Sequence, residues 1–392
     1  PSVTQPTITP TTAYTNTTLT TNTTYTDGDS DAGTVYFLWY RNGTNIYNQT
    51  NTSVATGTEV IATLDSANFS KDDTINVSVY ANDGGDSSTV WSTNTLTIQN
   101  LVPEISNTVL NATNVNNNTN QNLTLSWTAS DTDSDSVKNI TNWYLNGTSI
   151  TVLNMPFENN GSDTGTNDYS GFENNGTEQG NIVWNSTGGY GGFGAYEFDG
   201  VDDLINLGDP SSLEFTTSTS QMTISAWVKP KDTVGLDGIF SKYDSQNNEI
   251  EHLFFVDSSN GELNFWVSDD GSSTWQTSTA NGLISTNVWQ HVVVTLDVGT
   301  DTIKYYIDGV NYASQNDVGS GITDMSDLTE PTRIGAAICS DGNLCVQFNG
   351  TIDQVKIFNR SLTPEQILNL YNNRTDLISS NETSVDDVWH TE

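Results

Sequence analysis

Apolar and polar residues alternate along this chain in many short runs, which is the period of half-buried β-strands. The clearest runs are AYEFDGVDDLINLG and MTISAWVKP, within residues 195–229, and GTIDQVKIFN at residues 350–359. Asp199-Gly200 is a tight-turn signal inside the first run. The pattern predicts one sheet interior lined by Phe198, Leu204, Ile205, Leu207, Ile224, Ala226 and Val228, and another lined by Ile352, Val355 and Ile357.

Similar runs near residues 59–64, 74–81 and 95–99 predict a small sandwich in the N-terminal part, with Trp39 in its core. A helix is predicted near the other end of the chain. Thr363 is placed as its N-cap, Pro364 as its first residue and Gln366 as its third. The sequence therefore indicates an all-β protein with one short C-terminal helix.

A pattern in the N-terminal sandwich is repeated at a constant spacing. Asp27, Asp29, Asp31, Trp39, Tyr40, Asn42, Gly43 and Thr44 recur as Asp131, Asp133, Asp135, Trp143, Tyr144, Asn146, Gly147 and Thr148. A second sandwich is therefore expected to begin at Leu101. The repeat resembles the immunoglobulin-like repeats, of the PKD and cadherin-like kind, that occur in surface proteins.

The second copy is interrupted. In the first copy the strand leads on to SKDDTINVSVYANDG at residues 70–84, and a similar segment, SVDDVWHT, returns only at residues 384–391. We therefore predict an immunoglobulin-like sandwich with an extended N-terminal strand at 1–100, the first part of a second one at 101–151, an inserted domain at 152–373, and an incomplete returning part at 374–392. Insertion is tolerated where the termini of the guest domain lie close together.

Two expectations concern the ends of the chain. The start Pro-Ser-Val-Thr is expected to belong to a processed or excised piece of a larger product. For the final strands of the second copy there are two alternatives, that the protein continues or that another chain adds a strand.

The inserted domain resembles a known family. FDGVDD, ISAWVKP, VWQHVVVTLD, YYIDG, RIGA and GTIDQVKIFNRSLTPEQI occur in this order, and as a set they resemble the concanavalin A-like jelly roll of the laminin-G type. The resemblance implies two curved antiparallel sheets, a concave face with loops, and often one bound calcium ion. The predicted fold is thus two immunoglobulin-like sandwiches, the second interrupted by a laminin-G-like jelly roll.

The same resemblance suggests the metal ligands. DYSGFENNG at residues 168–176 is similar to the family's Asp-x-Ser-Gly…Asn-x-Gly loop, and Asp353 is similar to its distant carboxylate. A structural Ca²⁺ is expected at Asp168, Asn174 and Asp353, helped by carbonyls of Ser170 and Gly176. The alternative is ordinary Asx-turn chemistry. The acidic turns at 27–31 and 131–135 are expected to be solvated turns, since neither completes an EF-hand pattern. Asp199, Asp202 and Asp203 are a candidate catalytic carboxylate cluster, but FDGxDD in the family that the domain resembles is a turn between core strands, so a structural role is expected.

Charge narrows the possible partners. The 392 residues include 48 acidic and 11 basic ones, giving a net charge of −37. Neutralising nucleic-acid phosphates or anionic lipid requires basic residues, so neither is an expected partner. No apolar run is long enough to span a bilayer, so direct membrane insertion is not expected. Metal cations and high solubility fit the charge better.

Two features predict an oxidising, extracellular compartment. Cys339 and Cys345 flank a Ser-Asp-Gly-Asn turn signal and are expected to form a disulfide; free thiols or half a metal site are the alternatives. N-glycosylation sequons are dense, and none lies between residues 187 and 347. They are Asn16, Asn22, Asn42, Asn48, Asn51, Asn68, Asn76, Asn111, Asn117, Asn122, Asn139, Asn146, Asn160, Asn175, Asn185, Asn349, Asn359, Asn373 and Asn381.

No catalytic constellation is evident. Glu249, Glu251 and His252 lie close in sequence but do not give the carboxylate spacing of glycosidases on this fold. Tyr190, Phe193, Trp266 and Trp275 are candidates for stacking against sugar rings, with core or rim packing as the alternative.

We therefore predict a non-enzymatic, secreted or surface-anchored glycoprotein. Its laminin-G-like head would bind glycans or surface glycoproteins in adhesion. One alternative is a structural subunit of a surface fibre or sheath, in which copies of the chain exchange strands. Another is a glycosidase or its sugar-binding module.

Overall fold

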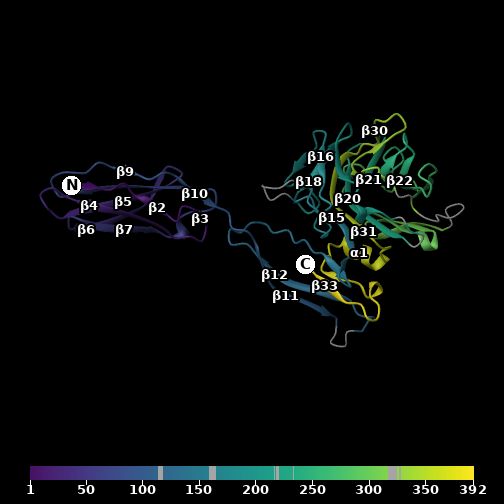
Figure 1. Cartoon of the computed structure of the whole chain (residues 1–392), viewed down its shortest axis with the longest axis horizontal. Helices are drawn as coiled ribbons and strands as arrows, with labels where there is room; N and C mark the ends of the chain where they lie inside the picture. Colours follow the sequence, from purple (N-terminus) through teal and green to yellow (C-terminus); the bar gives the residue numbers. More distant parts are fainter. Residues whose placement is uncertain are drawn as a thin grey trace. The chain divides into compact units, whose positions relative to one another are not determined.

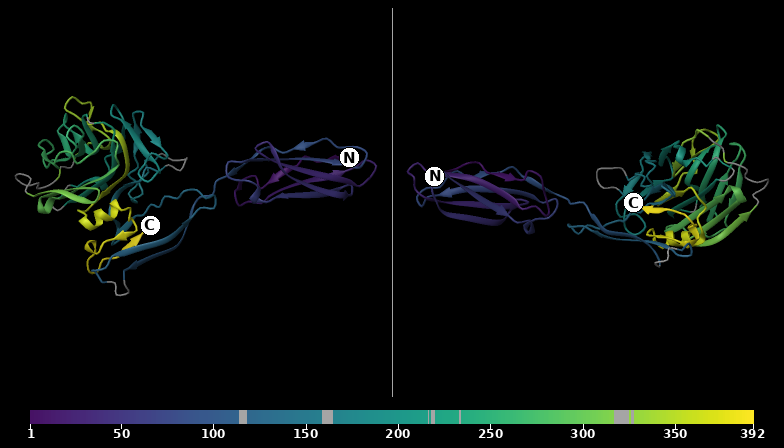
Figure 2. Two further views of the ribbon diagram at one scale, coloured as in Figure 1. Left: turned by 180° about the vertical axis from the view of Figure 1, so that it is seen from behind. Right: turned by 60° about the horizontal axis from the view of Figure 1, so that its bottom comes forward.

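The computed structural model describes residues 1–113, 118–158, 165–215, 217, 220–232, 234–316, 325 and 328–392. The chain forms two compact units, Pro1–Thr108 with Trp127–Val137, and Val109–Ser126 with Lys138–Glu392. The purple strands of Figure 1 belong to the first unit, and the green and yellow ones to the second. Figure 2 gives two further views of the same strands.

The first unit is a two-sheet β-sandwich. Its elements are β1 (Ser2–Val3), β2 (Thr7–Thr9), β3 (Ala13–Tyr14), β4 (Leu19–Thr26), β5 (Gly33–Arg41), β6 (Thr44–Val54), β7 (Thr58–Leu64), η1 (Ser66–Asn68), β8 (Thr74–Asn82), β9 (Trp91–Ser92) and β10 (Leu96–Gln99). One sheet has the order β1-β4-β2 with β7 beside β4, and the other β3-β10-β8-β5-β6 with β9 beside β8. Alternation along β5 buries Val35, Phe37 and Trp39 completely, so Trp39 is a core residue as predicted.

The second unit contains the jelly roll, which has two facing sheets. The β31 sheet comprises β15 (Thr151–Met155), β17 (Val183–Asn185), β18 (Ala195–Asp199), β20 (Gln221–Pro230), β25 (Gln290–Asp297), β26 (Thr302–Ile307), β27 (Val310–Asn316) and β31 (Asn349–Phe358). The β22 sheet comprises β16 (Thr177–Gln179), β19 (Leu204–Gly208), β21 (Leu236–Asp244), β22 (Glu249–Asp257), β23 (Glu262–Val267), β24 (Trp275–Ser278), β28 (Thr332–Ile334), β29 (Ala337–Ile338) and β30 (Leu344–Cys345). The 3-10 helices η2 (Ser211–Leu213) and η3 (Val298–Thr300) join strands.

All ten residues predicted to line the sheet interiors are buried, and all but Leu204 belong to one apolar cluster. Their division between two sheets was wrong. Strand β31 lies between β18 and β20, so Ile352 and Ile357 share a sheet with Ile224. Only the residues of β19 lie in the other sheet. The alternation of apolar and polar residues along a strand indicates which of its faces is buried. It does not indicate which distant strand pairs with it.

The predicted helix is α1 (Pro364–Tyr371), which packs on the jelly roll. The Thr363 hydroxyl accepts a hydrogen bond from the Gln366 N–H at 3.3 Å, so the predicted N-cap is present. Ile367 is fully buried, and the ring centroid of Tyr371 lies 5.8 Å from that of Trp227 on β20. The helix therefore packs its apolar face against the β31 sheet. Figure 1 shows α1 next to β31.

The remaining strands pair the segments that come before and after the jelly roll. They are β11 (Glu104–Ala112), β12 (Leu123–Ser130), β13 (Trp143–Leu145), β14 (Thr148–Ser149), β32 (Leu377–Ile378) and β33 (Trp389–Thr391), with η4 (Ser380–Glu382). The sheet orders are β11-β12-β32 and β14-β13-β33. The predicted boundary after residue 151 falls at the first residue of β15, and the boundary after 373 falls between α1 and β32.

A disulfide joins Cys339 and Cys345, as the sequence predicted. The Cα atoms are 5.7 Å apart, across a hairpin of β29 and β30 in which Ala337 pairs with Cys345. The hairpin thus brings the two Cα atoms within the distance that a disulfide requires.

Replacing both cysteines with serine is expected to destabilise the jelly roll by about 2 kcal/mol, because the bridge closes a short loop in the unfolded chain. Denaturant unfolding of the double variant beside the oxidised parent measures the difference. Equal midpoints would show that the bridge has no effect on stability.

Candidate functional site

The loop at residues 168–176 is held by hydrogen bonds to the Asp168 carboxylate. Its Oδ1 accepts from the N–H groups of Asn154 at 2.8 Å and Ser170 at 2.9 Å. Its Oδ2 accepts from the Ser170 hydroxyl at 2.6 Å and the Asn174 N–H at 2.9 Å. A carboxylate offers about four acceptor positions, so this one is saturated.

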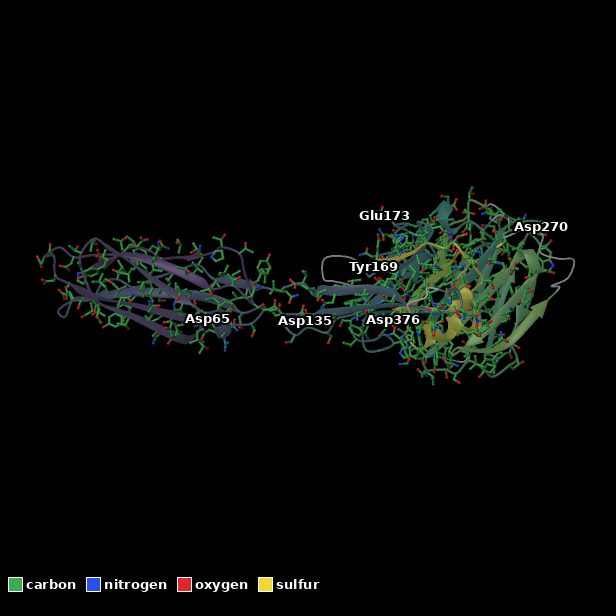
Figure 3. The ribbon with its side chains drawn as sticks, turned by 90° about the horizontal axis from the view of Figure 1, so that it is seen from below. Asp65, Asp135, Tyr169, Glu173, Asp270 and Asp376 are labelled. Atoms are coloured by element: carbon green, nitrogen blue, oxygen red, sulfur yellow. A yellow bond between two sulfur atoms is a disulfide. The ribbon has the colours of Figure 1, made fainter. Side chains whose placement is uncertain are left out.

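The other predicted ligands of this loop are also engaged. Asn174 donates to the Val152 carbonyl at 2.7 Å and accepts from the Ser212 hydroxyl at 2.9 Å. The Gly176 carbonyl accepts from the Thr166 hydroxyl at 2.9 Å. In this arrangement the loop oxygens do not fit a six-to-eight-coordinate calcium ion, and the Asx-turn alternative describes them better. Tyr169 and Glu173 of the same loop are exposed (Figure 3).

The fifth predicted ligand, Asp353, lies in a different setting on β31. It is fully buried, and its Oδ2 accepts from the Tyr190 N–H at 2.9 Å. Its Oδ1 accepts no hydrogen bond from any residue that the structure describes. No contact between described residues joins Asp353 to residues 168–176. An unpartnered buried carboxylate oxygen is costly unless a proton or a cation neutralises it.

A second carboxylate and several carbonyls surround Asp353. A Cβ on Gly189 would lie 2.7 Å from Asp353 Oδ2 and 2.9 Å from the Phe193 carbonyl oxygen, and would also contact the Gly194 carbonyl, so only glycine fits there. Glu158, next to the end of β15, accepts from the Gly194 N–H at 3.0 Å through Oε2. These oxygens are the hard ligands that calcium prefers. They fit a cation better than the loop at 168–176 does.

Lys138 supplies one positive charge at this place. Its Nζ lies 3.3 Å from Glu158 Oε1 and 5.0 Å from the ring centroid of Phe193. Burial raises the pKa of Asp353 to about 7; Lys138 opposes the rise and Glu158 adds to it. The sequence analysis missed Glu158 and Lys138 because neither lies in a recognised motif. A carboxylate directly after a buried strand was the available signal.

Two of the acidic turns contain hydrogen bonds from their own backbone to their carboxylates. Asp131, Asp133 and Asp135 lie close enough to share an ion, as do Asp199, Asp202 and Asp203. Within each group, however, one carboxylate accepts backbone N–H bonds. Asp131 Oδ1 accepts from Asp133 at 2.8 Å, and Asp203 Oδ2 accepts from Asp199 at 2.9 Å. Both groups are therefore explained as structured turns.

A second titratable cluster is buried at the β22 sheet. Lys242 on β21 is inaccessible to solvent, and its Nζ lies 2.8 Å from Asp209 Oδ1, 3.6 Å from Glu251 Oε2, and in contact with Glu214 Oε1. The Glu251 side chain is also fully buried, and its Oε1 lies 3.3 Å from His252 Nδ1. Burial raises the pKa of Glu214 to about 7. One lysine therefore compensates three carboxylates.

The four aromatic residues predicted to bind sugars do not gather at one place. Tyr190 stacks on Trp227 with ring centroids 3.3 Å apart, so one of its faces is covered. Trp266 packs edge-on against Phe255 at 5.1 Å, and Trp275 packs against the main core. Phe193 lies under Lys138. These contacts favour the packing alternative, and a role in ligand binding stays a prediction.

A pocket of about 350 Å³ lies beside the 168–176 loop instead. Phe172 contributes a ring that is 38% exposed, and the Glu214 carboxylate, fixed by Lys242, forms part of the wall. The lining is completed by Val152, Ser212, Phe215, Ser220, Gln221 and Asn359. An aromatic ring beside hydroxyls, amides and a carboxylate is the chemistry that recognises sugar rings.

All predicted sequon asparagines that the structure describes are exposed or half-buried, but the amide nitrogen of Asn51 is inaccessible to solvent. Asn117 and Asn160 lie outside the described residues. Asn42 and Asn146 also shape turns, since each has a positive φ before a glycine. No helix in the described part of the chain is long and apolar enough to cross a membrane.

The second unit contains a concanavalin A-like jelly roll. Residues 199–368 match the concanavalin A-like lectin/glucanases superfamily, a match that covers less than half of the chain. The jelly-roll fold predicted from the sequence is thereby confirmed, and the chain is nearly all-β with one short helix among the described residues. The immunoglobulin-like assignment of the sandwiches stays a prediction.

Solved structures similar to this chain include binding domains of botulinum neurotoxins. The serotype D/C domain is 15% identical with a TM-score of 0.44, and covers 57% of this chain and 52% of its own. The receptor binding domain of serotype D is 18% identical, with a TM-score of 0.43. The match covers 57% of this chain and 53% of that domain's chain. This chain therefore spans about half the length of these structures. Likenesses at this level do not say what the chain binds.

Proposed function

We propose that this chain is a non-enzymatic binding protein whose jelly roll recognises glycans, alone or on glycoproteins, at the pocket beside Phe172. The match of residues 199–368 to a lectin-containing superfamily supports the class of activity. The observation that carries the proposal is the composition of the pocket. An exposed aromatic ring, Phe172, lines it together with the hydroxyls of Ser212 and Ser220, the amides of Gln221 and Asn359, and the carboxylate of Glu214.

Each element of the pocket has a role in this proposal. The Phe172 ring stacks on the apolar face of a sugar ring. The Ser212 and Ser220 hydroxyls offer hydrogen bonds to the sugar, while the Glu214 carboxylate in the pocket wall is fixed by the Lys242 ammonium. Because this carboxylate is already paired with a buried cation, we assign it to the pocket wall and not to proton transfer.

We further propose that the protein is secreted or displayed on a cell surface, where it contributes to adhesion. The disulfide supports an oxidising compartment. The accessible sequons support a glycoprotein. Calcium, in this proposal, is held by Asp353 and Glu158 with backbone carbonyls of the Gly-rich loop at 188–194. When bound, the ion supplies positive charge that ties β31 to the end of β15.

Phe172→Ala is expected to weaken glycan binding about tenfold, the equivalent of losing one stacking interaction. The chain, produced without N-glycosylation, is first screened on a glycan array, and the best sugar is then titrated by calorimetry against both proteins. Tyr312→Ala is the matched control, because Tyr312 is an exposed aromatic residue of β27 that does not line the pocket. A screen without hits would overturn the proposal, as would equal affinities for the parent and Phe172→Ala.

A further inference from the structure

A groove of about 280 Å³ lies between the strands that flank the jelly roll. One side is formed by β11 and β12, and the other by Trp389 of β33 and the residues just before it. The lining residues are Leu110, Asn111, Ala112, Asn118, Thr119, Gln121, Leu123, Thr383, Ser384, Asp387 and Trp389. Figure 1 shows β33 at the C-terminal end of the chain. The groove is distinct from the pocket of the proposed function.

The first sandwich contains a counterpart of β33, and the strand registers identify it. Trp39 pairs with Val77, and its repeat Trp143 pairs with Thr391. In the other sheet Leu19 pairs with Leu64, and its repeat Leu123 pairs with Ile378. One constant shift along the sequence relates Leu64 to Ile378 and Val77 to Thr391. Strand β33 therefore takes the place of β8.

The turn before each of these strands is built identically. The Ser70 N–H donates to Asp73 Oδ2 at 2.8 Å, and the Ser384 N–H donates to Asp387 Oδ2 at 2.7 Å. In each turn the preceding aspartate has a positive φ, 65° at Asp72 and 70° at Asp386. Asp387 of the groove is thus the counterpart of Asp73.

In the first sandwich the corresponding position is filled by β10. The Ile98 N–H donates to the Asp73 carbonyl at 2.9 Å, and the Asp72 N–H donates to the Ile98 carbonyl at 2.9 Å. Leu96 pairs with Ile75, the counterpart of Trp389, and the Ile98 side chain is fully buried. Strand β10 thus joins the outer edge of β8 and adds an apolar side chain to the core.

In the second sandwich β33 pairs with β13 on one side and, among the described residues, has no strand on its other side. Val385 and Val388, just before β33, are 76% and 64% exposed. An unpaired strand edge beside an apolar groove is a site for strand addition. Strand β10 of a second copy is already paired with its own β3 and β8, so that strand is a poor donor.

We propose that this groove accepts a β-strand of a partner polypeptide, antiparallel to β33. Its backbone pairs with Asp386 and Asp387 as β10 pairs with Asp72 and Asp73. The chemistry required is that of Leu-Thr-Ile-Gln in β10: two apolar residues at alternate positions with polar neighbours, and no proline. The second apolar residue enters the groove.

The test extends the chain beyond Glu392 with a flexible linker as long as residues 79–93, followed by a copy of residues 94–100. The linker turns a weak bimolecular contact into an intramolecular one. A control extension carries aspartate in place of the isoleucine that copies Ile98. Amide hydrogen exchange at Trp389–Thr391 is expected to slow at least tenfold with the isoleucine extension and to stay unchanged with the control.

A groove-filling variant sharpens the result. Ala112→Trp, in a residue of the groove wall, is expected to remove the difference between the two extensions. Equal exchange with both extensions in the parent would overturn the proposal. It would also be overturned if the unextended chain is a dimer in which β33 is already protected, because the occupant would then be a second copy. Neither outcome depends on glycan binding, so failure here is distinguishable from failure of the proposed function.

Discussion

Replacing Lys242 with methionine is expected to destabilise the jelly roll by about 3–5 kcal/mol, because the change leaves buried carboxylates without their cation. Methionine keeps most of the side-chain volume, so the loss reports charge and not a cavity. Asp209, Glu214 and Glu251 all face the lysine, and Glu251 is fully buried. In a domain of this size the melting temperature should fall by on the order of 10 °C.

Lys231→Met is the control for this substitution. Lys231 is exposed and lies just after β20 in the same domain, so its replacement should change the stability by less than about 0.5 kcal/mol. The cost of Lys242→Met should also depend on pH. The pKa of Glu214 is already raised to about 7, and removing the ammonium raises it further. The variant should therefore lose less stability at pH 5, where Glu214 takes up a proton, than at pH 8. A cost that is equal at both pH values would contradict an electrostatic role.

The parts of this protein that could be predicted from sequence are those fixed by local pattern. The cap of α1 follows from Thr363, Pro364 and Gln366, which are neighbours in the chain. The Cys339–Cys345 bridge follows from a turn of four residues. The constant spacing of the Trp39 and Trp143 motifs revealed the repeat without any knowledge of strand pairing.

The neighbours of Asp353 and Lys242 could not be predicted, because they depend on how strands distant in the sequence pair with one another. Asp353 was singled out as a metal ligand, but its neighbours in space are Glu158 and the Gly-rich loop, not Asp168. Nothing in the alternation of β31 indicates that the end of β15 lies beside it. The Lys242 cluster is similar, since its carboxylates come from separate segments that meet only in the folded sheet. The register of a strand pair is set by the whole core, and a local window does not contain it.

When calcium is removed, the unfolding free energy of the jelly roll is expected to depend on pH, and the largest contribution is expected from Asp353. Its pKa is raised from 3.8 to about 7 by burial, so the folded state favours the protonated carboxyl. The stabilisation is complete below pH 3.8, falls as the pH rises, and is lost above about pH 7. The difference corresponds to on the order of 4 kcal/mol. Asp353→Asn should remove this dependence in chelator, measured as unfolding free energy from pH 4 to pH 8.

Adding calcium at pH 8 should restore the lost stability in the parent, by about 2.7 kcal/mol at a hundredfold excess over the dissociation constant. Asp353→Asn should show no such gain, because asparagine brings no charge to balance the ion. Asp168→Asn is the matched control: it loses hydrogen bonds of the 168–176 loop but should keep the calcium response.

The reverse pattern, with the response lost in Asp168→Asn and kept in Asp353→Asn, would place the ion in the loop that the sequence first indicated. If calcium stabilises none of these proteins while Asp353→Asn still flattens the pH profile, the buried carboxyl binds a proton and not a metal. The unpartnered Oδ1 of Asp353 therefore binds either a calcium ion or a proton. Titrating calcium into the parent and the Asp353→Asn variant distinguishes the two.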